Sequence, residues 1–380
     1  MSHKVVIGAN FGDEGKGLFT DYLCRKSSNP LVIRFSGGQQ AGHTVVASGI
    51  RHTFSNFGAG TLQGAPCYYS HFCTIDPVGI VNELESLLKK GVEPKLYIDE
   101  RSPVTTPYDI KYNQNNHPHG SCGVGVGDTI RRQLDHYSLV FGDLFYPFVF
   151  KTRLDLIKKY YDGYTDVDIE DFLECCSIIT SSSLIEKSYG MPEGEYSDYI
   201  YEGSQGLLLD QDFGFFPHVT RASTGTKNAA EIAGSNNLEI FLVTRAYQTR
   251  HGKGPMSNEH LPHNIRKNPV ETNVANAFQG KFRRTLLDLS LIEYAMKRDE
   301  IIRTTKDQNL VITCLDHMID EYRFVWQGEI VHCDDESDFV RKIGYILGFD
   351  TVYVSSSDDA LNITAMVGQS VTTKHESRYI

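Results

Sequence analysis

The first residues that could do chemistry are charged groups in a glycine-rich turn near the start of the chain. The segment "GDEGKG", residues 12–17, follows a short apolar run and precedes a helical pattern. Such a turn offers an anion its backbone N–H groups and the positive end of the next helix, and Lys16 adds a full charge. It departs from the usual phosphate loop G-x-x-x-x-G-K-[ST], because Asn10 stands at the first glycine position and Gly17 follows the lysine. The segment therefore predicts a phosphate site of a different type.

The acidic pair ahead of that lysine has two interpretations. The hydroxyl residue that is missing here normally binds magnesium, so Asp13 is a natural replacement ligand. Its carboxylate could also take a proton from a substrate that lies beside the terminal phosphate. Alternatively, Asp13 and Glu14 cap the following helix, where negative charge is favoured. The turn alone leaves both interpretations open.

A second turn of similar type follows the next apolar run. The segment "RFSGGQQAGHTVV", residues 34–46, places glycines and then His43 directly after a predicted strand. A histidine near a transferring phosphate can act as an acid or stabilise developing charge. A lone histidine is more often structural, but two such turns in succession favour a shared site for phosphate chemistry.

The elements that must position these turns are short strands alternating with helices. The apolar patterns predict strands over residues 4–8, 30–35, 96–98, 199–201, 240–244, 310–313 and 351–354, and helices over 16–25, 78–90, 154–161, 286–297 and 337–347. This alternation predicts an α/β fold with a large, mostly parallel central sheet and helices on both of its faces. Such sheets bind ligands at the carboxyl ends of their strands, where both turns would lie. No break in composition marks a second domain, so we expect one domain over residues 1–380, with loop and small subdomain insertions.

The composition limits the possible partners and the cellular setting. The net charge of −11 argues against a large nucleic-acid surface, although it permits a local nucleotide pocket. No apolar run approaches the length of a membrane span, and the N-terminus reaches charge and glycine too early for a signal peptide. The eight cysteines form neither a C-x-x-C motif nor a regular disulfide pattern. We therefore expect a cytoplasmic protein with no nucleic-acid or membrane partner.

Four ordered motifs resemble the adenylosuccinate synthetase family, which joins aspartate to IMP while hydrolysing GTP. The first two are the turns at residues 12–17 and 34–46, which match the family's "GDEGKG" and "GGxxAGHT". The third is "YEGSQGLLLDQDFGFFPHVT", residues 201–220, and the fourth is "AYQTRHGKGP", residues 246–255. Because the motifs keep their order over most of the chain, the resemblance implies the same fold and the same type of chemistry.

The resemblance implies a two-step reaction with Asp13, His43 and Gln205 as catalytic residues. Asp13 would take the N1 proton of the purine and bind Mg²⁺, while the 6-oxygen attacks the γ-phosphate and His43 acts as the acid. An amine, L-aspartate in the family, would then displace phosphate at C6. The residues implied at the phosphates are Gly12, Glu14, Gly15, Lys16, Gly17, Gly42 and Thr44, and those implied at the metal are Asp13 and the carbonyl of Gly42.

Departures from the family pattern fall where the purine nucleotide is recognised. Gln40 replaces an asparagine, and Ser121-Cys122 replaces a pair of threonines. The resemblance also implies a homodimer. Arg132 is a weak match for the arginine that reaches the nucleotide of the neighbouring subunit, because the spacing here is shorter. The residues assigned to the purine nucleotide are Gln40, Ser121, Cys122, Arg132, Gln205 and Thr220.

Two further loops are altered. In the amine-donor loop, Phe278, Gln279 and Lys281 replace Thr, Thr and Arg, whereas Arg283 is kept. Because arginine grips a carboxylate with two bonds and lysine with a point charge, the identity of the donor stays open. At the base of the triphosphate, Asp316 of the family's T-K-L-D is kept, but its lysine is Cys314, so the co-substrate is GTP or ATP.

Three functions remain open at this point. The first is a divergent adenylosuccinate synthetase that makes the usual product from IMP. The second is a specialised relative with the same chemistry on another purine nucleotide, such as the viral enzymes that act on dGMP. Those enzymes often carry serine in place of the catalytic aspartate, whereas Asp13 is present here. The third is a non-catalytic nucleotide sensor, which predicts damage at the chemical residues rather than at the recognition residues.

Overall fold

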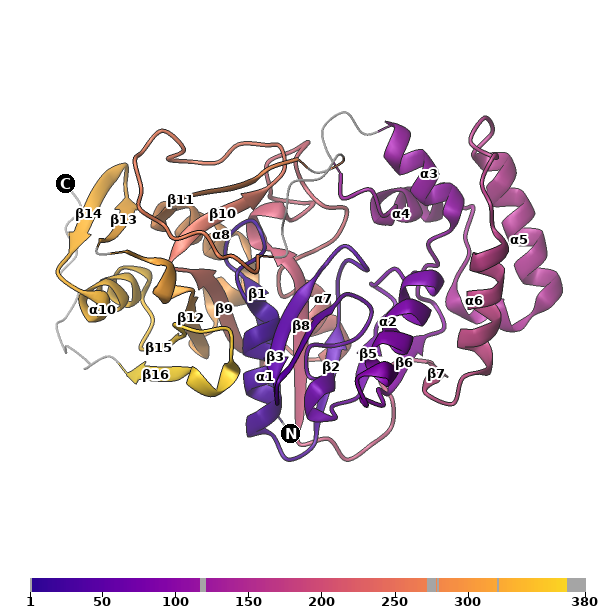
Figure 1. Cartoon of the computed structure of the whole chain (residues 1–380), viewed down its shortest axis with the longest axis horizontal. Helices are drawn as coiled ribbons and strands as arrows, with labels where there is room; N and C mark the ends of the chain where they lie inside the picture. The colour runs from indigo at the N-terminus through magenta and orange to yellow at the C-terminus, as the bar shows by residue number, and fades with distance from the viewer. Residues whose placement is uncertain (1, 117–120, 272–277, 279, 320, 368–380) are drawn as a thin grey trace.

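The computed structural model describes residues 2–116, 121–271, 278, 280–319 and 321–367. Within these ranges a ten-stranded sheet runs through the middle of the molecule in the order β16-β15-β12-β9-β1-β8-β2-β5-β6-β7 (Figure 1). Neighbouring strands are parallel except β15 and β16, which are antiparallel. The strands, in sheet order, are Thr364–Val367, Thr351–Val354, Gln308–Thr313, Glu239–Arg245, Ser2–Gly8, Asp198–Gly206, Pro30–Arg34, Cys67–Tyr69, Leu96–Asp99 and Ile185–Ser188.

Helices cover both faces of this sheet, as the strand alternation requires. On β1, Val5 and Ile7 belong to a core cluster that includes residues of α7, α8 and α10. Val6 points to the other face, into a cluster with Leu18 and Phe19 of α1. The helices named here are α1 (Lys16–Lys26), α7 (Lys227–Ala233), α8 (Leu289–Arg298) and α10 (Glu336–Leu347). The predicted α/β fold with a mostly parallel sheet is therefore confirmed.

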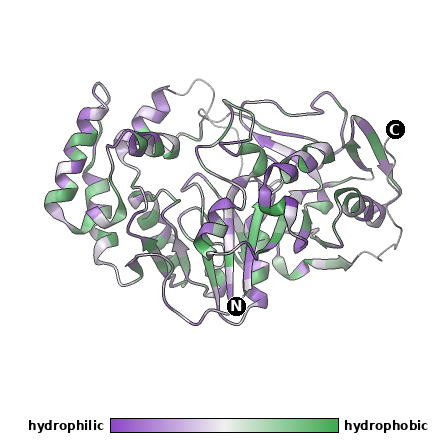
Figure 2. Cartoon of the chain, turned by 180° about the vertical axis from the view of Figure 1, so that it is seen from behind, coloured by the Kyte–Doolittle hydropathy of each residue, from purple (hydrophilic) through white to green (hydrophobic). Residues whose placement is uncertain are grey.

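Two groups of elements extend the sheet at its ends (Figure 1). At one end lie the helices α2 (Pro77–Lys89), α3 (Pro107–Asn116), α4 (Val126–Leu134), α5 (Pro147–Tyr160) and α6 (Glu170–Ser181). Toward the other end lies a second sheet of β10 (Tyr247–His251), β11 (Phe282–Asp288), β13 (Tyr322–Trp326) and β14 (Glu329–Cys333), and the short helix α9 spans Glu300–Thr304. A hairpin of β3 (His43–Ala47) and β4 (Ile50–Phe54) follows the second glycine turn. Figure 2 shows apolar residues concentrated on the central strands.

Two of the predicted helices begin elsewhere. The helix predicted over 286–297 is preceded by a strand, because residues up to Asp288 belong to β11 and the Asp288 carboxylate caps α8 by accepting from Ser290 N–H at 3.0 Å. The apolar run at this junction fits both the strand period and the helix period, so the pattern predicted one helix where the structure has the end of β11 and the start of α8. The helix predicted from residue 154 starts earlier, at Pro147, which suits the first helical turn. Within the described ranges, every helix is too short or too polar to cross a bilayer.

Candidate active site

A cavity of about 550 Å³ lies at the carboxyl ends of the central strands. Loops after β1 and β2 line it, together with the ends of β8, β9 and β12. The predicted site residues among its lining are Gly12, Asp13, Glu14, Gly15, Lys16, Gly17, Gln40, Gly42, His43, Thr44, Gln205 and Asp316. The sheet thus brings together residues that are more than 300 positions apart in the sequence, at the edge where parallel sheets bind ligands.

The loop after β1 is built from left-handed residues. Gly12, Asp13 and Gly15 have φ angles of 93°, 63° and 98°. Gly15 is the N-cap of α1 and makes no side-chain capping bond, and no acidic residue lies in the first turn of the helix. The alternative in which the acidic pair merely caps this helix is therefore wrong. The side chain of Asp13 lines the cavity instead.

The buried carboxylate of Glu14 accepts hydrogen bonds from other residues of this loop. It is 1% exposed, and its carboxylate accepts from the N–H groups of Asn10 and Gly12 at 3.2 and 2.7 Å and from the Lys16 ammonium at 2.8 Å. Gly8 makes room for it, because a Cβ at that position would lie 2.2 Å from the carboxylate. In this structure the Gly12 N–H already donates to Glu14, and the assignment of Gly12 and Glu14 to phosphate stays a prediction.

Asp13 has the surroundings of a proton acceptor. Burial raises the pKa of its carboxyl above the ordinary value, although the cations of Arg245 and Lys16 oppose that shift. A carboxylate with a raised pKa is a better base than one in water. Its position beside Lys16 places that base next to the expected phosphates.

His43 is held by a carboxylate that the sequence reasoning did not single out. Its Nδ1 lies 2.5 Å from Oε1 of Glu202, which is fully buried in β8. Glu202 Oε2 in turn accepts from Ala59 N–H at 3.1 Å and lies 3.9 Å from Arg34. Gly17 lets the two turns meet, because a Cβ there would lie 2.6 Å from the Cβ of His43. The ring is therefore fixed in one orientation.

The second ring nitrogen of His43 is left for a ligand. Nε2 is buried and has no hydrogen-bond partner among the described residues. Burial lowers the pKa of His43, although Glu202 opposes the shift. Burial alone would raise the pKa of the Glu202 carboxyl, but His43, Arg34 and the Ala59 N–H together hold it below its ordinary value. The pair is thus an imidazole on a charged carboxylate, with Nε2 on the cavity side.

Two amide side chains in the cavity also lack partners. Both amide atoms of Gln40 and the Oε1 of Gln205 are buried without a hydrogen bond to any described residue. Buried polar atoms are normally satisfied, so an unsatisfied set that lines one cavity indicates a polar ligand. Gln40 and Gln205 therefore lie where a substrate with donors and acceptors would meet them.

The other residues predicted for the purine nucleotide lie beside the cavity rather than in its lining. The loop that carries Ser121 and Cys122 is tied to the second turn, because Gln39 donates to the carbonyl of Val124 at 2.9 Å. The Thr220 N–H donates to the carbonyl of Leu209, a lining residue, at 2.8 Å. Their roles stay predictions.

The prediction that Arg132 reaches the nucleotide of a neighbouring subunit is wrong. Its side chain is fully buried, and it donates to Asp109 at 2.9 and 3.1 Å and to the carbonyls of Val104 and Tyr137. A guanidinium enclosed in this way stabilises the junction of α3 and α4 and cannot extend to a neighbouring subunit. The sequence misled here because spacing says nothing about burial.

The amine-donor loop is described only in part. Gln279 lies outside the described residues, and Phe278 and Lys281 are both exposed. Arg283 forms an ion pair with Glu259 at 2.9 Å and donates to the Gly254 carbonyl at 2.8 Å. Their assignment to a donor stays a prediction.

The far end of the cavity contains a buried cation that the sequence reasoning also missed. Arg245, the last residue of β9, is 8% exposed and lines the cavity with Cys314, Asp316 and His317. It stands directly before the fourth motif, and Glu202 stands inside the third. A polar residue at the end of an otherwise apolar parallel strand is the signal that could have found Arg245, whereas Glu202 lies in the middle of β8, a strand with several polar residues, and gives no such signal.

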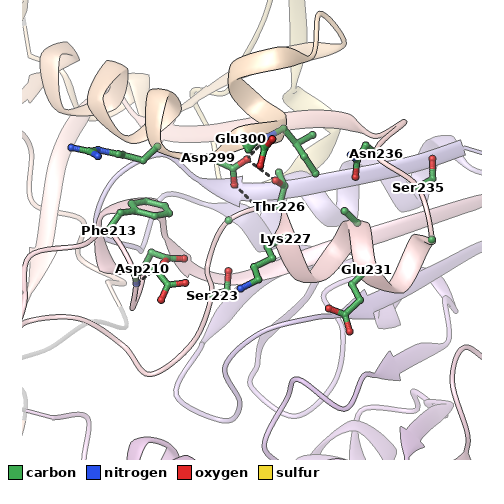
Figure 3. Close-up of a pocket in the computed structure, with 16 residues that line it drawn as sticks. Asp210, Phe213, Ser223, Thr226, Lys227, Glu231, Ser235, Asn236, Asp299 and Glu300 are labelled. Carbon is green, nitrogen blue, oxygen red and sulfur yellow. Dashed lines mark hydrogen bonds between the residues drawn. The ribbon is translucent and has the colours of Figure 1, made fainter.

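A second, larger cavity of about 710 Å³ lies between the segment after β8 and the junction of α8 and α9 (Figure 3). Its most buried carboxylates already have partners. Asp299 accepts from the N–H and the hydroxyl of Thr226 at 2.7 and 2.6 Å, and Asp210 accepts from the Thr224 N–H at 2.6 Å. Asp210, Asp212 and Phe213 of the third motif line it, but none of the predicted site residues does, so the smaller cavity is the candidate active site.

The sequence matches proteins of one family. The family model described as adenylosuccinate synthetase matches residues 5–323. The adenylosuccinate synthetase of Francisella philomiragia is 29% identical over 366 residues, which cover 88% of this chain and 83% of that protein. The adenylosuccinate synthetase of Caldanaerobacter subterraneus is 32% identical over 288 residues, which cover 68% and 66%.

Solved structures share the fold. The fully ligated adenylosuccinate synthetase of Plasmodium falciparum has a TM-score of 0.72 at 16% identity, and the match covers 97% of this chain and all of that one. The succinoaminodeoxyadenylate synthetase of cyanophage S-2L, bound to dGMP and to dATP as an energy donor, has a TM-score of 0.60 at 14% identity, with 96% and 95% covered. Together with the family match, these findings show that the chain belongs to the adenylosuccinate synthetase family of purine-biosynthesis ligases.

Proposed function

We propose that this protein is a nucleoside-triphosphate-dependent ligase that joins L-aspartate to C6 of a purine nucleotide, converting IMP to adenylosuccinate. The observation that carries the proposal is the meeting of Asp13, Lys16 and His43, from two separate glycine-rich turns, in one cavity with unsatisfied amides. The family gives the reaction class, and this arrangement supports each of its steps.

In the first step Asp13 accepts the N1 proton of the purine. Loss of that proton turns the 6-oxygen into a nucleophile, which attacks the γ-phosphate and releases the nucleoside diphosphate. The place of Asp13 in the cavity, in the same loop as Lys16, supports this role. Lys16 lines the same cavity, and its ammonium would stabilise the charge of the phosphates after exchanging its partner Glu14 for them.

His43 would act on the transferring phosphoryl group through Nε2. Although burial lowers the pKa of His43, the arrival of phosphate anions would raise it again, so the ring would take up a proton when the triphosphate binds. Glu202 stabilises the resulting imidazolium at Nδ1 and keeps Nε2 in place. Glu202 is thus a positioning residue, and His43 is the group that touches phosphate.

The donor set also fits Mg²⁺. This ion is usually held by one or two carboxylates together with substrate phosphates. Asp13 and the Gly42 carbonyl both line the cavity and supply oxygen donors of the right chemistry. When bound, Mg²⁺ would neutralise charge on the phosphates during transfer. Among the described residues no group of three or more His, Cys, Asp or Glu side chains could hold a metal ion by itself.

In the second step the amine attacks C6. A C–N bond forms, the C6–O bond breaks, inorganic phosphate leaves, and the amine loses a proton. Phosphorylation in the first step makes this possible, because phosphate leaves far more readily than oxide. Lys281 and Arg283 would meet the carboxylates of the donor, although Arg283 would first have to exchange its partner Glu259.

Asp316 would bind the base of the triphosphate. It lines the far end of the cavity and is 39% exposed, so its carboxylate can accept from a base. The N1–H and 2-amino groups of guanine both donate to a carboxylate, whereas adenine presents N1 as an acceptor. We therefore propose GTP as the co-substrate, with ATP as the alternative. We also propose a single domain over residues 1–380, a homodimer and a cytoplasmic setting.

A second candidate function is the same chemistry on dGMP. The altered residues Gln40, Ser121 and Cys122 favour it, because they lie in or beside the cavity on the side assigned to the nucleotide. The presence of Asp13 and His43 disfavours a non-catalytic sensor, which would not need a buried base and an oriented histidine.

The test is a product screen with purified protein. The protein is incubated with Mg²⁺, L-aspartate, GTP or ATP, and IMP, GMP or dGMP in turn, and succinylated nucleotides are identified by mass spectrometry. We expect adenylosuccinate from IMP with GTP. Product from dGMP alone would establish the second candidate, and no product from any combination would contradict the ligase proposal. The matched control is Asp13→Asn, which keeps side-chain volume and should still bind triphosphate but form no product.

A further inference from the structure

Arg245 is a buried cation that lines the active-site cavity and contacts the Asp13 loop through one nitrogen and Tyr247 through another. It ends β9, where it lies opposite Thr313 of β12. Its Nε donates to the backbone carbonyl of Asp13 at 2.5 Å. Its Nη1 donates to the hydroxyl of Tyr247 at 2.8 Å, two residues further along the chain. One side chain therefore joins the catalytic loop to the start of the second sheet.

The contact with Asp13 matters because of the backbone at that residue. Asp13 has a φ of 63°, a left-handed conformation that side chains other than glycine disfavour. Such a residue keeps its place only when its surroundings hold it. The Arg245 bond fixes the carbonyl of Asp13, and the Thr249 hydroxyl adds a weaker bond to the Gly12 carbonyl at 3.3 Å. The direction of the catalytic carboxylate thus depends on Arg245.

The second contact leads toward the base-binding end. The hydroxyl of Tyr247, which is 2% exposed, lies 2.7 Å from Nδ1 of His317. His317 is 7% exposed, and its Nε2 lies 3.7 Å from the carboxylate of Asp316. A continuous series of contacts therefore runs from Asp316 through His317, Tyr247 and Arg245 to the Asp13 carbonyl.

The chemistry of Arg245 suits this task. A guanidinium has several N–H groups at fixed angles, so it can hold a carbonyl and a hydroxyl at once, whereas the single ammonium of a lysine cannot fix both directions. Its charge is balanced by Glu271 at 3.1 Å, and its guanidinium carbon lies 5.6 and 5.4 Å from the ring centroids of Tyr247 and Phe282. These neighbours hold the guanidinium between the two ends.

We propose that Arg245 is a positioning residue that couples binding of the triphosphate's base at Asp316 to the placement of Asp13. The inference rests on the proposed function, since it takes Asp316 as the base-binding group and Asp13 as the base. A purine bound at Asp316 fixes the His317 ring, which holds the Tyr247 hydroxyl and, through it, the guanidinium on the Asp13 carbonyl. Correct triphosphate thus promotes proton transfer as well as binding.

The test is a double-mutant cycle on the full-length protein. Tyr247→Phe removes only the hydroxyl that links the two ends. We expect it to lower kcat about tenfold with GTP while changing the KM for GTP less than about twofold. In an Asp316→Asn background, the same change should lower kcat less than about twofold. The base no longer binds at residue 316 in that background, so the Tyr247 hydroxyl has no binding event to relay to Asp13. Similar falls of about tenfold in both backgrounds would overturn the coupling.

A matched control tests whether the loss of any buried tyrosine hydroxyl would lower kcat as much as Tyr247→Phe. Tyr161 is also buried, and its hydroxyl donates to Asp109 at 2.8 Å, in a core cluster away from the cavity. Tyr161→Phe should leave kcat within about twofold of the parent in both backgrounds. A tenfold loss of kcat in Tyr161→Phe would contradict the inference, because removal of any buried hydroxyl would then suffice.

Arg245→Lys provides a second variant that does not depend on Tyr247. It keeps the charge but not the two fixed directions, so we expect a fall in kcat at least as large as that of Tyr247→Phe, again with a nearly unchanged KM for GTP. Wild-type kcat in Arg245→Lys would overturn the proposal. An unmutated protein without ligase activity would instead contradict the proposed function, so the two failures are distinguishable.

Discussion

The two strands of one hairpin each contribute a buried histidine that pairs with a glutamate, and the two pairs differ in what their remaining atoms contact. His43 of β3 faces Glu202 at 2.5 Å, and His52 of β4 faces Glu83 at 3.4 Å. Both histidines are 6% exposed. The types of residue and the degree of burial are therefore the same, so neither of them can distinguish a catalytic pair from a structural one.

The difference lies in what the remaining atoms contact. Glu83 accepts from the backbone N–H groups of Ser55 and Asn56 at 3.0 and 2.7 Å and from the Asn56 amide at 3.1 Å. The other nitrogen of His52 lies 2.8 Å from the Lys90 ammonium. In the His43 pair, by contrast, Nε2 is buried without a partner among the described residues and borders the cavity. A pair whose hydrogen bonds are all internal stabilises the fold, and a pair with one atom left for a ligand can act on it.

The largest effect should come from replacing the two histidines in parallel. His43→Asn should lower kcat about 10²- to 10⁴-fold, the range for losing a general acid, with the protein still folded. His52→Asn should leave kcat within about twofold and lower the melting temperature, because it removes internal bonds only. Steady-state kinetics and thermal unfolding of both variants check this. Similar losses of kcat in the two variants would remove the distinction between the pairs.

Replacing Glu202 should have the next largest effect. Glu202→Gln removes the charge that stabilises a protonated His43, so we expect kcat to fall about 10²-fold, at the lower end of the range for acid catalysis. The KM for the triphosphate should change little, because Glu202 does not face the cavity. A variant that loses stability but keeps kcat would show that Glu202 has only a structural role.

Glu83→Gln is the matched substitution in the structural pair. It replaces a carboxylate that is bonded to Ser55, Asn56 and His52, so the free energy of unfolding should fall by about 1–3 kcal/mol. Denaturant unfolding measures that loss, and kcat should stay within about twofold of the wild type. A strong fall in kcat together with unchanged stability would show that the second pair takes part in the reaction.

The smallest effect should come from Lys90→Met. Lys90 is an exposed residue at the end of α2 that donates to the Arg51 carbonyl at 3.0 Å and contacts His52. Its loss should cost about 1 kcal/mol or less, because water can replace the ammonium at an exposed site. A loss above about 3 kcal/mol in the same unfolding experiment would mean that His52 depends on Lys90 far more than the exposure suggests.

The sequence predicted well what depends on local pattern. The glycine-rich turns at residues 12–17 and 34–46 follow strands β1 and β2, as the alternating pattern predicted, and both line one cavity. The internal role of Glu14 could not be predicted, because it depends on loop hydrogen bonds that a motif does not encode.

Long-range partners could not be predicted either. Glu202 reaches His43 because β8 lies between β1 and β2, in register with Val6 and Arg34. Strand order in the sheet is a property of the whole fold, so the 159 positions between His43 and Glu202 conceal their contact. The same limit explains Arg132, whose match to a family position gave no indication that Asp109 encloses it.

The most direct test of the proposed chemistry follows the 6-oxygen. IMP labelled with ¹⁸O at position 6 is incubated with the protein, Mg²⁺, GTP and L-aspartate, and the inorganic phosphate is examined by mass spectrometry. A 6-phosphoryl intermediate predicts one ¹⁸O atom in each phosphate released, because the C6–O bond breaks and the oxygen leaves with phosphorus. Adenylosuccinate formed with unlabelled phosphate would contradict the mechanism assigned to Asp13 and His43.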